Sequence, residues 1–147
     1  MNTVSPDSVL VVLPTYNEAE TILTVITRIR KSAPGVHILV VDDSSPDQTG
    51  NIVNGYIERF DVAGEVILLT RAEKEGLGKA YLAGFDYAFK RGYSYIVSMD
   101  SDGSHQPEQL PGFISVIENE NASLVLGSRW VAGGAVHNWP RRRKFLS

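Results

Sequence analysis

Short apolar runs alternate along the chain with longer stretches in which apolar and polar residues mix. Apolar residues in the longer stretches recur at helical spacing, as Ile22, Val25, Ile26 and Ile29 do. The runs predict strands over residues 8–13, 36–41, 65–69, 95–99 and 123–126, and the longer stretches predict helices over 17–32, 46–60, 78–91 and 107–119. Strands that are apolar on both faces and separated by helices indicate an α/β fold. We expect a mostly parallel sheet flanked by helices on both faces.

Turn residues mark several boundaries of these elements. Gly92 ends the third predicted helix, and Pro107 stands at the first position of the fourth. The periodicity fails after Gly127, and no capping residue or closing element follows it. We therefore expect a single domain over residues 1–147 that is truncated at its C-terminal end.

Composition narrows the classes of protein that fit. The 147 residues are 43% hydrophobic and 21% charged, which is ordinary for a globular protein. The chain contains no cysteine, which excludes disulfides and thiolate metal sites. The first residues do not resemble a secretory signal, and the apolar runs are far shorter than the ~20 residues that span a bilayer. A chain of this kind is not expected to cross a membrane, although it could lie against one.

Charge is unevenly distributed. Residues 129–147 hold five basic side chains and no acidic one, while the whole chain has a net charge of −3, so the preceding residues carry −8. A cationic end suits an anionic partner such as a phosphate or an acidic lipid surface, and it also suits a solvated tail. Nucleic acid is not expected as a partner, because the acidic remainder would repel it and no recognition motif is present.

Two carboxylates follow the predicted strand 95–99. Asp100 and Asp102 share one face if the strand geometry continues, and they stand at a carboxyl end, where open α/β sheets bind ligands. Clustered carboxylates repel one another unless a cation lies between them, so a divalent ion that bridges them to a diphosphate is one explanation. Ser104 and His105 are possible further ligands, although His105 also fits the start of the next helix. An Asp pair in a plain turn is the alternative.

Polar residues also follow the first predicted strand. Pro14 is expected to end that strand, because proline cannot donate to the ladder. Tyr16 is then a possible stacking surface for a base, and Glu18 a possible acceptor at a helix start. An ordinary turn with an acidic first helical turn is the alternative.

The second predicted strand ends in Asp42 and Asp43, which point to opposite faces, so at most one of them looks into a strand-end cleft. Such a carboxylate could accept hydrogen bonds from a base or from ribose hydroxyls. Ser45 and Asp47 fit helix capping.

Two further candidates are weaker. The glycine-rich segment 76–80 precedes a helix and could offer backbone N–H groups to phosphate, but it fits neither the Walker A loop nor the dinucleotide fingerprint. Arg129 follows the fifth predicted strand and has the planar fork that suits phosphate. In a parallel sheet, the polar clusters after the first, second and fourth predicted strands would meet Arg129 at one edge.

With these residues assembled, the chain resembles the family-2 glycosyltransferases with the GT-A (Rossmann-like) fold. More narrowly, it resembles the dolichol-phosphate mannose synthases and their bacterial polyprenol-phosphate counterparts. The matching segments are LPTYNEAETI (13–22), VVDDSSPDQTG (40–50), GLGKAYLAGF (76–85), MDSDGSHQPE (99–108) and GSRWVAGGAVHNWPRRRKFLS (127–147). The first, second and fourth segments are typical of many family-2 enzymes, whereas the third and fifth are more specific to the polyprenyl-phosphate group.

The resemblance implies roles for particular residues. The guanosine end of GDP-mannose would be held by Pro14, Tyr16, Glu18, Val41 and Asp43. The ribose and the metal-bound diphosphate would be met by Asp100, Ser101 and Asp102, with Asp102 as a catalytic residue. The metal, Mg²⁺ or Mn²⁺, would be held by Asp100, Asp102 and Ser104, the last at a position where some relatives carry Gln. The acceptor phosphate or the donor diphosphate would be attracted by Arg129 and Arg143, both also expected to be catalytic.

The implied activity is metal-dependent, inverting transfer of mannose from GDP-mannose to a polyprenyl (dolichyl-type) monophosphate, which yields polyprenyl-phosphate-mannose and GDP. The acceptor is already anionic, so a direct displacement needs no strong general base. The implied location is peripheral, at the cytoplasmic face of a membrane or on a membrane-anchored partner.

Three other functions share part of this pattern. A transferase that moves glucose or another sugar onto the same lipid would show the same motifs, and a truncated, non-catalytic nucleotide-binding module would keep the donor site. A phospho-acceptor receiver domain is rejected, because its acidic pair follows the first strand, whereas Asp42 and Asp43 follow the second.

Overall fold

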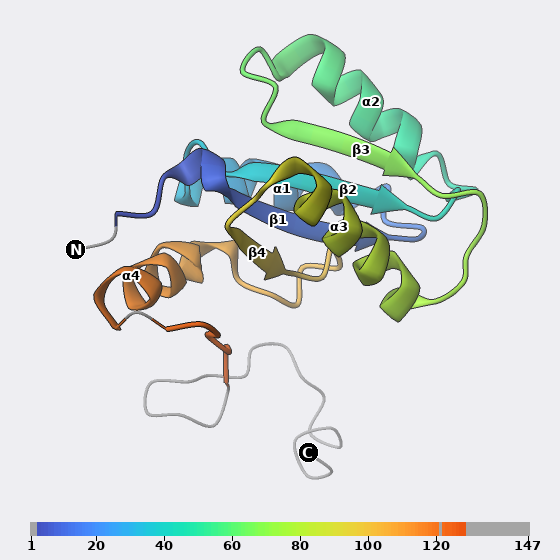
Figure 1. Cartoon of the computed structure of the whole chain (residues 1–147). Helices are drawn as coiled ribbons and strands as arrows, with labels where there is room; N and C mark the ends of the chain where they lie inside the picture. Colours follow the sequence, from blue (N-terminus) through green and yellow to red (C-terminus); the bar gives the residue numbers. More distant parts are fainter. Residues whose placement is uncertain (1–2, 121, 129–147) are drawn as a thin grey trace, which may run out of the picture.

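The computed structural model describes residues 3–120 and 122–128, and within them it contains one parallel sheet. The strands are β1 (Val9–Thr15), β2 (His37–Asp42), β3 (Val66–Thr70) and β4 (Tyr95–Ser98). Their order is β3-β2-β1-β4, and every neighbouring pair runs parallel (Figure 1). The predicted parallel α/β fold is confirmed.

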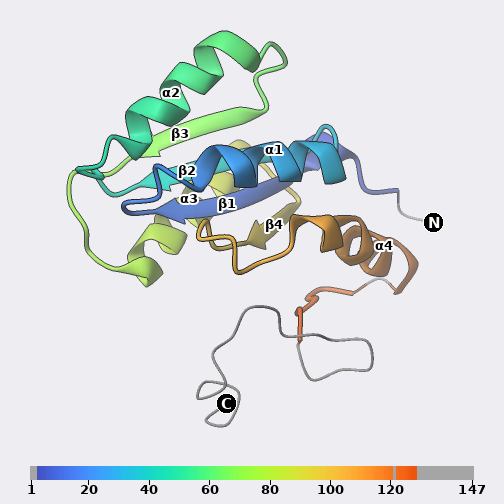
Figure 2. The ribbon, with the colours of Figure 1, turned by 180° about the vertical axis from the view of Figure 1, so that it is seen from behind.

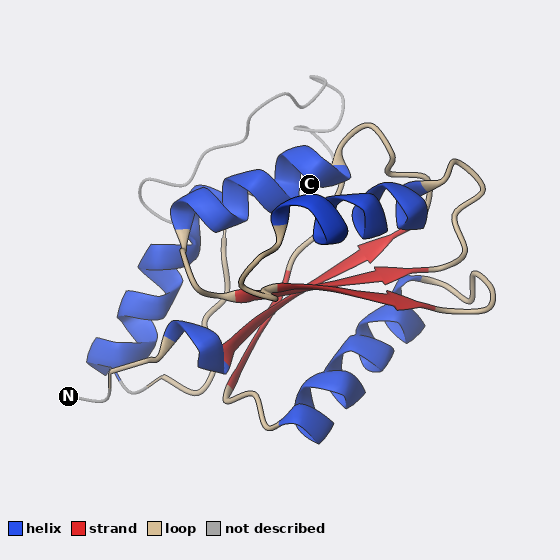
Figure 3. Cartoon of the chain, turned by 90° about the horizontal axis from the view of Figure 1, so that it is seen from above, coloured by secondary structure: helices blue, strands red, loops and turns tan. Residues whose placement is uncertain are grey.

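Helices cover both faces of the sheet (Figure 3). The helices are α1 (Ile22–Ser32), α2 (Thr49–Phe60), α3 (Leu77–Arg91) and α4 (Leu110–Glu120), with short 3₁₀ turns η1 (Pro6–Ser8) and η2 (Pro107–Gln109). α1, α2 and α4 contribute to one apolar cluster, whereas α3 packs against the opposite face. Figure 2 shows α1 in front of β1 and β2, with α3 behind them.

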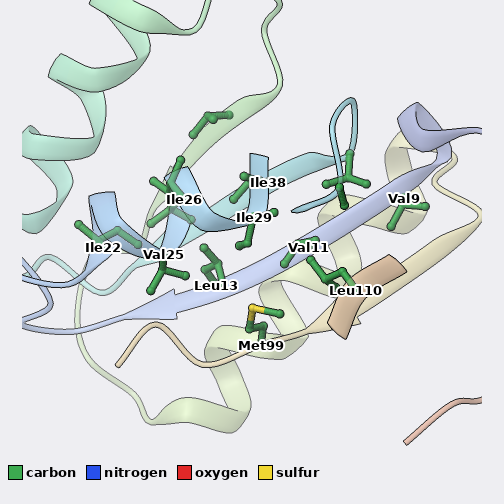
Figure 4. Close-up of a cluster of buried hydrophobic side chains, with 14 of the residues drawn as sticks. Val9, Val11, Leu13, Ile22, Val25, Ile26, Ile29, Ile38, Met99 and Leu110 are labelled. Atoms are coloured by element: carbon green, nitrogen blue, oxygen red, sulfur yellow. The ribbon is translucent and has the colours of Figure 1, made fainter. Parts of the chain in front are cut away.

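The two faces of β1 explain why that strand is apolar throughout. Val9, Val11 and Leu13 pack toward α1, while Leu10 and Val12 join the cluster of α3. Figure 4 shows the first of these clusters, in which Ile22 and Ile26 of α1 lie over the strand. Each such fully buried aliphatic side chain stabilises the fold by ~1.5–3 kcal/mol relative to an exposed one.

Some element boundaries differ from those expected. β1 continues through Pro14 to Thr15. Its ladder with β4 ends at Val12, so no hydrogen bond to β4 is needed at Pro14, and the strand tolerates a residue without an N–H there. α1 begins at Ile22 rather than at residue 17, since Asn17 adopts a left-handed φ of 60°. α2 likewise begins at Thr49, whose backbone N–H donates to the Asp47 carboxylate at 3.0 Å.

The predicted fifth strand, 123–126, is wrong. Residues 122–128 run without regular structure, and Leu124 and Leu126 are 74% and 76% exposed. A strand needs a partner that accepts and donates its ladder hydrogen bonds, and among the described residues β4 pairs with β1 alone. An apolar run without such a partner gains nothing from the extended conformation.

An ion pair ties α1 to η2 and predicts a pH effect on stability. Arg28 Nε and Nη2 donate to the two Glu108 carboxylate oxygens at 2.8 and 2.7 Å, and these hydrogen bonds lower the pKa of Glu108 from 4.5 to about 2. A carboxyl whose pKa is lower in the folded state stabilises the fold above its ordinary pKa, and this contribution is lost as the pH falls from 4.5 to about 2. We expect Glu108→Gln to lower the urea midpoint slightly at pH 7 and not at pH 2, because the pair is exposed.

The matched control is Glu120→Gln, at an exposed carboxylate of α4. A difference between the Glu108 variant and the wild type that persists unchanged at pH 2 would contradict the ion pair.

Candidate active site

A pocket of about 250 Å³ opens at the carboxyl edge of the sheet. It lies where the strand order reverses between β1 and β4, which is the place at which open α/β sheets bind ligands. Its walls come from the ends of β1, β2 and β4, from the loop after β3 and from the start of α3. The lining residues are Pro14, Thr15, Tyr16, Glu18, Asp43, Lys74, Gly76, Leu77, Ala80, Asp100, Ser101 and Asp102.

The structure brings together most of the residues that the sequence singled out. The candidates in the pocket wall are Pro14, Tyr16, Glu18, Asp43, Asp100, Ser101 and Asp102. Val41 is fully buried in the apolar cluster between the sheet and α3, and it pairs in register with Pro14. Its side chain does not reach the pocket. Ser104 stands outside the lining, and Arg129 and Arg143 lie outside the described residues.

The loop after β4 is fastened to the end of β1. The Ser101 hydroxyl donates to the Pro14 carbonyl at 2.7 Å, and the Met99 N–H donates to the Val12 carbonyl at 3.2 Å. Ser101 is itself buried. These bonds place the carboxylates on either side of Ser101, those of Asp100 and Asp102, at the pocket wall.

The two aspartates at the end of β2 face different surroundings, and the sequence predicted that at most one of them would look into the cleft. The Asp42 carboxylate turns inward and accepts from the hydroxyls of Thr15 at 3.0 Å and Ser45 at 2.6 Å. Asp43 lines the pocket, where Arg71 donates to both of its carboxylate oxygens. Only Asp43 of the two faces the cleft.

Asp100 is oriented by two neighbours. The Tyr81 hydroxyl donates to Asp100 Oδ1 at 2.9 Å, and the Asp100 backbone N–H donates to His105 Nδ1 at 3.0 Å. Burial, followed by the adjacent Asp100 carboxylate, raises the pKa of Tyr81, so this phenol stays protonated and keeps donating at neutral pH.

Asp102 is held as an anion. Burial acts to raise the pKa of Asp102. Hydrogen bonds from the Ser104 hydroxyl and from the Ser104 backbone N–H at 2.8 Å, together with nearby His105, outweigh burial, so the pKa lies below its ordinary value. Ser104 thus supports Asp102 through both its hydroxyl and its backbone N–H.

The donor set fits a hard divalent cation. Asp100 and Asp102 offer carboxylate oxygens, which Mg²⁺ and Mn²⁺ prefer. Within residues 3–120 and 122–128, no three His, Cys, Asp or Glu side chains form a metal-binding group. Mg²⁺ is commonly held by one or two carboxylates plus substrate phosphates, so two aspartates suffice when the ligand brings a diphosphate.

The loop after β3 and the start of α3 form one wall of the pocket. The glycine-rich segment 76–80, a weak candidate from the sequence, contributes Gly76, Leu77 and Ala80 to this wall, whereas Lys74 was missed. Lys74 places its ammonium 3.8 Å from the centre of the Tyr16 ring, and Gly76 precedes α3 with a φ of 99°. The available signal for Lys74 was the segment 71–76, which is mostly polar and starts at the carboxyl end of a strand in the same parallel sheet.

Comparison with known proteins decides the family. Residues 10–147 match the family described as "Glycosyl transferase family 2". The chain belongs to this family. As a family 2 glycosyltransferase chain, it is 48% identical over 138 residues to the polyprenol monophosphomannose synthase of Mycolicibacterium smegmatis, covering 94% of this chain and 51% of that protein. It is 47% identical to the undecaprenyl-phosphate mannosyltransferase of Micrococcus luteus, covering 95% of this chain and 55% of that protein.

A solved structure supports the fold of this glycosyltransferase chain. The mannosyltransferase PcManGT of Pyrobaculum calidifontis, in complex with GDP-Man and Mn²⁺, matches with a TM-score of 0.55 and 26% identity. The match covers 67% of this chain and 30% of that one. The predicted GT-A-like arrangement is thereby confirmed. The chain spans about half the length of the two curated relatives named above.

Proposed function

We propose that the chain takes part in the transfer of mannose from GDP-mannose to a polyprenyl monophosphate, with Mg²⁺ or Mn²⁺ as cofactor. The observation that carries this proposal is the meeting of Asp100 and Asp102 with Tyr16 and Asp43 in one pocket at the switch point of the sheet. The names of the relatives from M. smegmatis and M. luteus, and the GDP-Man and Mn²⁺ in the neighbouring structure, support the substrate class and the metal.

The pocket suggests how the donor is bound. The guanosine end lies against Tyr16, with Glu18 and Asp43 as acceptors for N–H groups and hydroxyls, while Val41 supports this wall from the core. The ribose and diphosphate lie toward Ser101 and the aspartates on either side of it.

Asp100 and Asp102 would hold the metal, with Ser104 as a further ligand. The metal supplies Lewis-acid stabilisation of the charge that develops on the departing diphosphate. Arg129 and Arg143 are proposed to attract the acceptor phosphate or the donor diphosphate, because a guanidinium suits phosphate.

The reaction is a direct displacement at the anomeric carbon. A phosphate oxygen of the lipid forms the new bond to this carbon as the bond to the GDP oxygen breaks, and the electron pair leaves with GDP, so the anomeric centre inverts. The acceptor is already ionised, and no side chain has to remove a proton. The contribution of the protein is to hold two anions in reacting position and to offset their charge.

The lipid acceptor implies work at a membrane surface. We propose that residues 1–147 belong to a single catalytic domain that sits peripherally at the cytoplasmic face or docks on a membrane-anchored partner, and that nucleic acid is not a partner. Among the helices of the described residues, none combines the length and the apolar character needed to span a bilayer.

The test is transfer of radiolabelled mannose from GDP-mannose into a lipid that mild acid hydrolyses, with polyprenyl phosphate vesicles and either Mn²⁺ or Mg²⁺. We expect label in the lipid that EDTA abolishes. Label from UDP-glucose but not from GDP-mannose would identify a sister sugar transferase. Metal-dependent binding of GDP without any transfer would identify a nucleotide-binding module, and absence of both would contradict the proposal.

A further inference from the structure

Asp43 is a carboxylate almost removed from water. Its side chain is 5% exposed, and yet it lines the pocket. A polar side chain buried in this way needs a hydrogen-bond partner to compensate for its lost hydration. Arg71 is that partner, since its Nη1 donates to Oδ1 at 2.9 Å and to Oδ2 at 3.1 Å. One nitrogen that bridges both oxygens fixes the orientation of the Asp43 carboxylate.

Arg71 is itself held in place from several sides. Its backbone N–H donates to the Asp42 carbonyl at 2.8 Å, and its own carbonyl accepts from the Ser44 hydroxyl at 2.6 Å. Its second guanidinium nitrogen, Nη2, donates to Glu75 at 2.6 Å, and Glu75 also accepts from Lys79 at 2.6 Å. The guanidinium is therefore locked between the loop that follows β2 and the loop that follows β3.

We propose that Arg71 is a positioning residue for the donor nucleotide. Arg71 is not part of the pocket lining, so it acts through Asp43, whose carboxylate it holds aimed at the hydrogen-bond donors of the base or the ribose. This role rests on the proposed function, because it presumes that the pocket binds a nucleoside diphosphate. With this role for Arg71, the loop after β3 is one of the parts of the fold that determine nucleotide affinity.

The test measures GDP affinity by calorimetry in the presence of MnCl₂, using the full chain. We expect Arg71→Gln to raise the Kd for GDP about tenfold, and Asp43→Asn to do the same. The double variant is expected to bind GDP no more weakly than Asp43→Asn alone, because Arg71 acts through the carboxylate. The control is Lys90→Gln, which removes an exposed ion pair with Asp86 and leaves GDP affinity unchanged.

Two milder variants protect the test against misfolding of Arg71→Gln. Arg71→Lys keeps the charge without the planar fork, and we expect a Kd raised about threefold. Glu75→Gln frees one arm of Arg71 at a position 40% exposed, and we expect about a twofold rise with an unchanged melting temperature.

The outcomes separate this role from the proposed function. A wild-type chain that does not bind GDP contradicts the proposed function, and the role of Arg71 falls with it. A wild-type chain that binds GDP, with Arg71→Lys and Glu75→Gln indistinguishable from it, overturns the role of Arg71 alone. A double variant that loses the sum of both single effects also overturns it, since Arg71 would then act independently of Asp43.

Discussion

Asp102→Asn is expected to remove manganese-dependent binding of GDP and to slow mannose transfer by ~2–4 kcal/mol of barrier, which is about 30- to 1,000-fold. The substitution keeps the size of the side chain but replaces an anionic oxygen with an amide. Asp102 lines the pocket, and the hydrogen bonds of Ser104 hold it as an anion. The loss of affinity and rate would therefore come from the missing charge and not from a change of shape. Calorimetry with GDP and MnCl₂ beside the transfer assay measures both effects.

The control for Asp102→Asn is Asp86→Asn, at an exposed aspartate of α3 that pairs with Lys90 and is outside the pocket wall. This variant should bind GDP as the wild type does. If Asp102→Asn transferred mannose at a near-normal rate, the assignment of the metal to this aspartate would be wrong.

Gly84→Ala is expected to destabilise the fold by about 1–3 kcal/mol, the cost of overpacking a tight core. Gly84 is buried in α3 where the helix crosses β1, and a Cβ there would lie 2.4 Å from Cγ1 of Val12. Alanine ordinarily favours a helix over glycine by ~1 kcal/mol, so a net loss identifies the contact as its cause. Urea unfolding of the variant measures the change.

A matched substitution separates packing from helix propensity. A Cβ at Gly55 of α2 would meet no atom within 4 Å, so Gly55→Ala should leave stability unchanged or raise it. Shortening the opposing side chain should also relieve the clash, and Gly84→Ala should therefore cost less in a Val12→Ala background. Equal effects of Gly84→Ala and Gly55→Ala would show that α3 does not approach β1 as closely as described.

The strands that the sequence predicted well are those that are buried on both faces. β1 and β2 are apolar at every central position, because helices cover both sides of them. The run 123–126 has the same local pattern and no strand partner in the described part of the chain, so periodicity alone could not identify it as irregular. The early start expected for α1 failed for a local reason, the left-handed backbone at Asn17.

The site was predictable as far as topology determines it. A parallel sheet gathers the carboxyl ends of its strands, so Asp43 and Asp102 could be placed together without coordinates. The contact of Arg71 with Asp43 could not be predicted in this way. It depends on a side chain that reaches an aspartate 28 positions away, just after a neighbouring strand. Lys74 was missed for a similar reason, since its partner Tyr16 follows β1 and is 58 positions away in the chain.

The hydrogen bond between Ser101 and Pro14 joins residues 87 positions apart, and it has a consequence for the order of events during synthesis. β1, β2 and β3 are adjacent in the chain and can associate as they leave the ribosome, whereas the remaining edge of β1 must wait until β4 has been translated. Nucleotide binding should therefore be acquired late in biogenesis, in the step that docks β4. Under the proposed function, a nucleotide present at that moment would favour the docked arrangement by mass action and would act as a folding ligand.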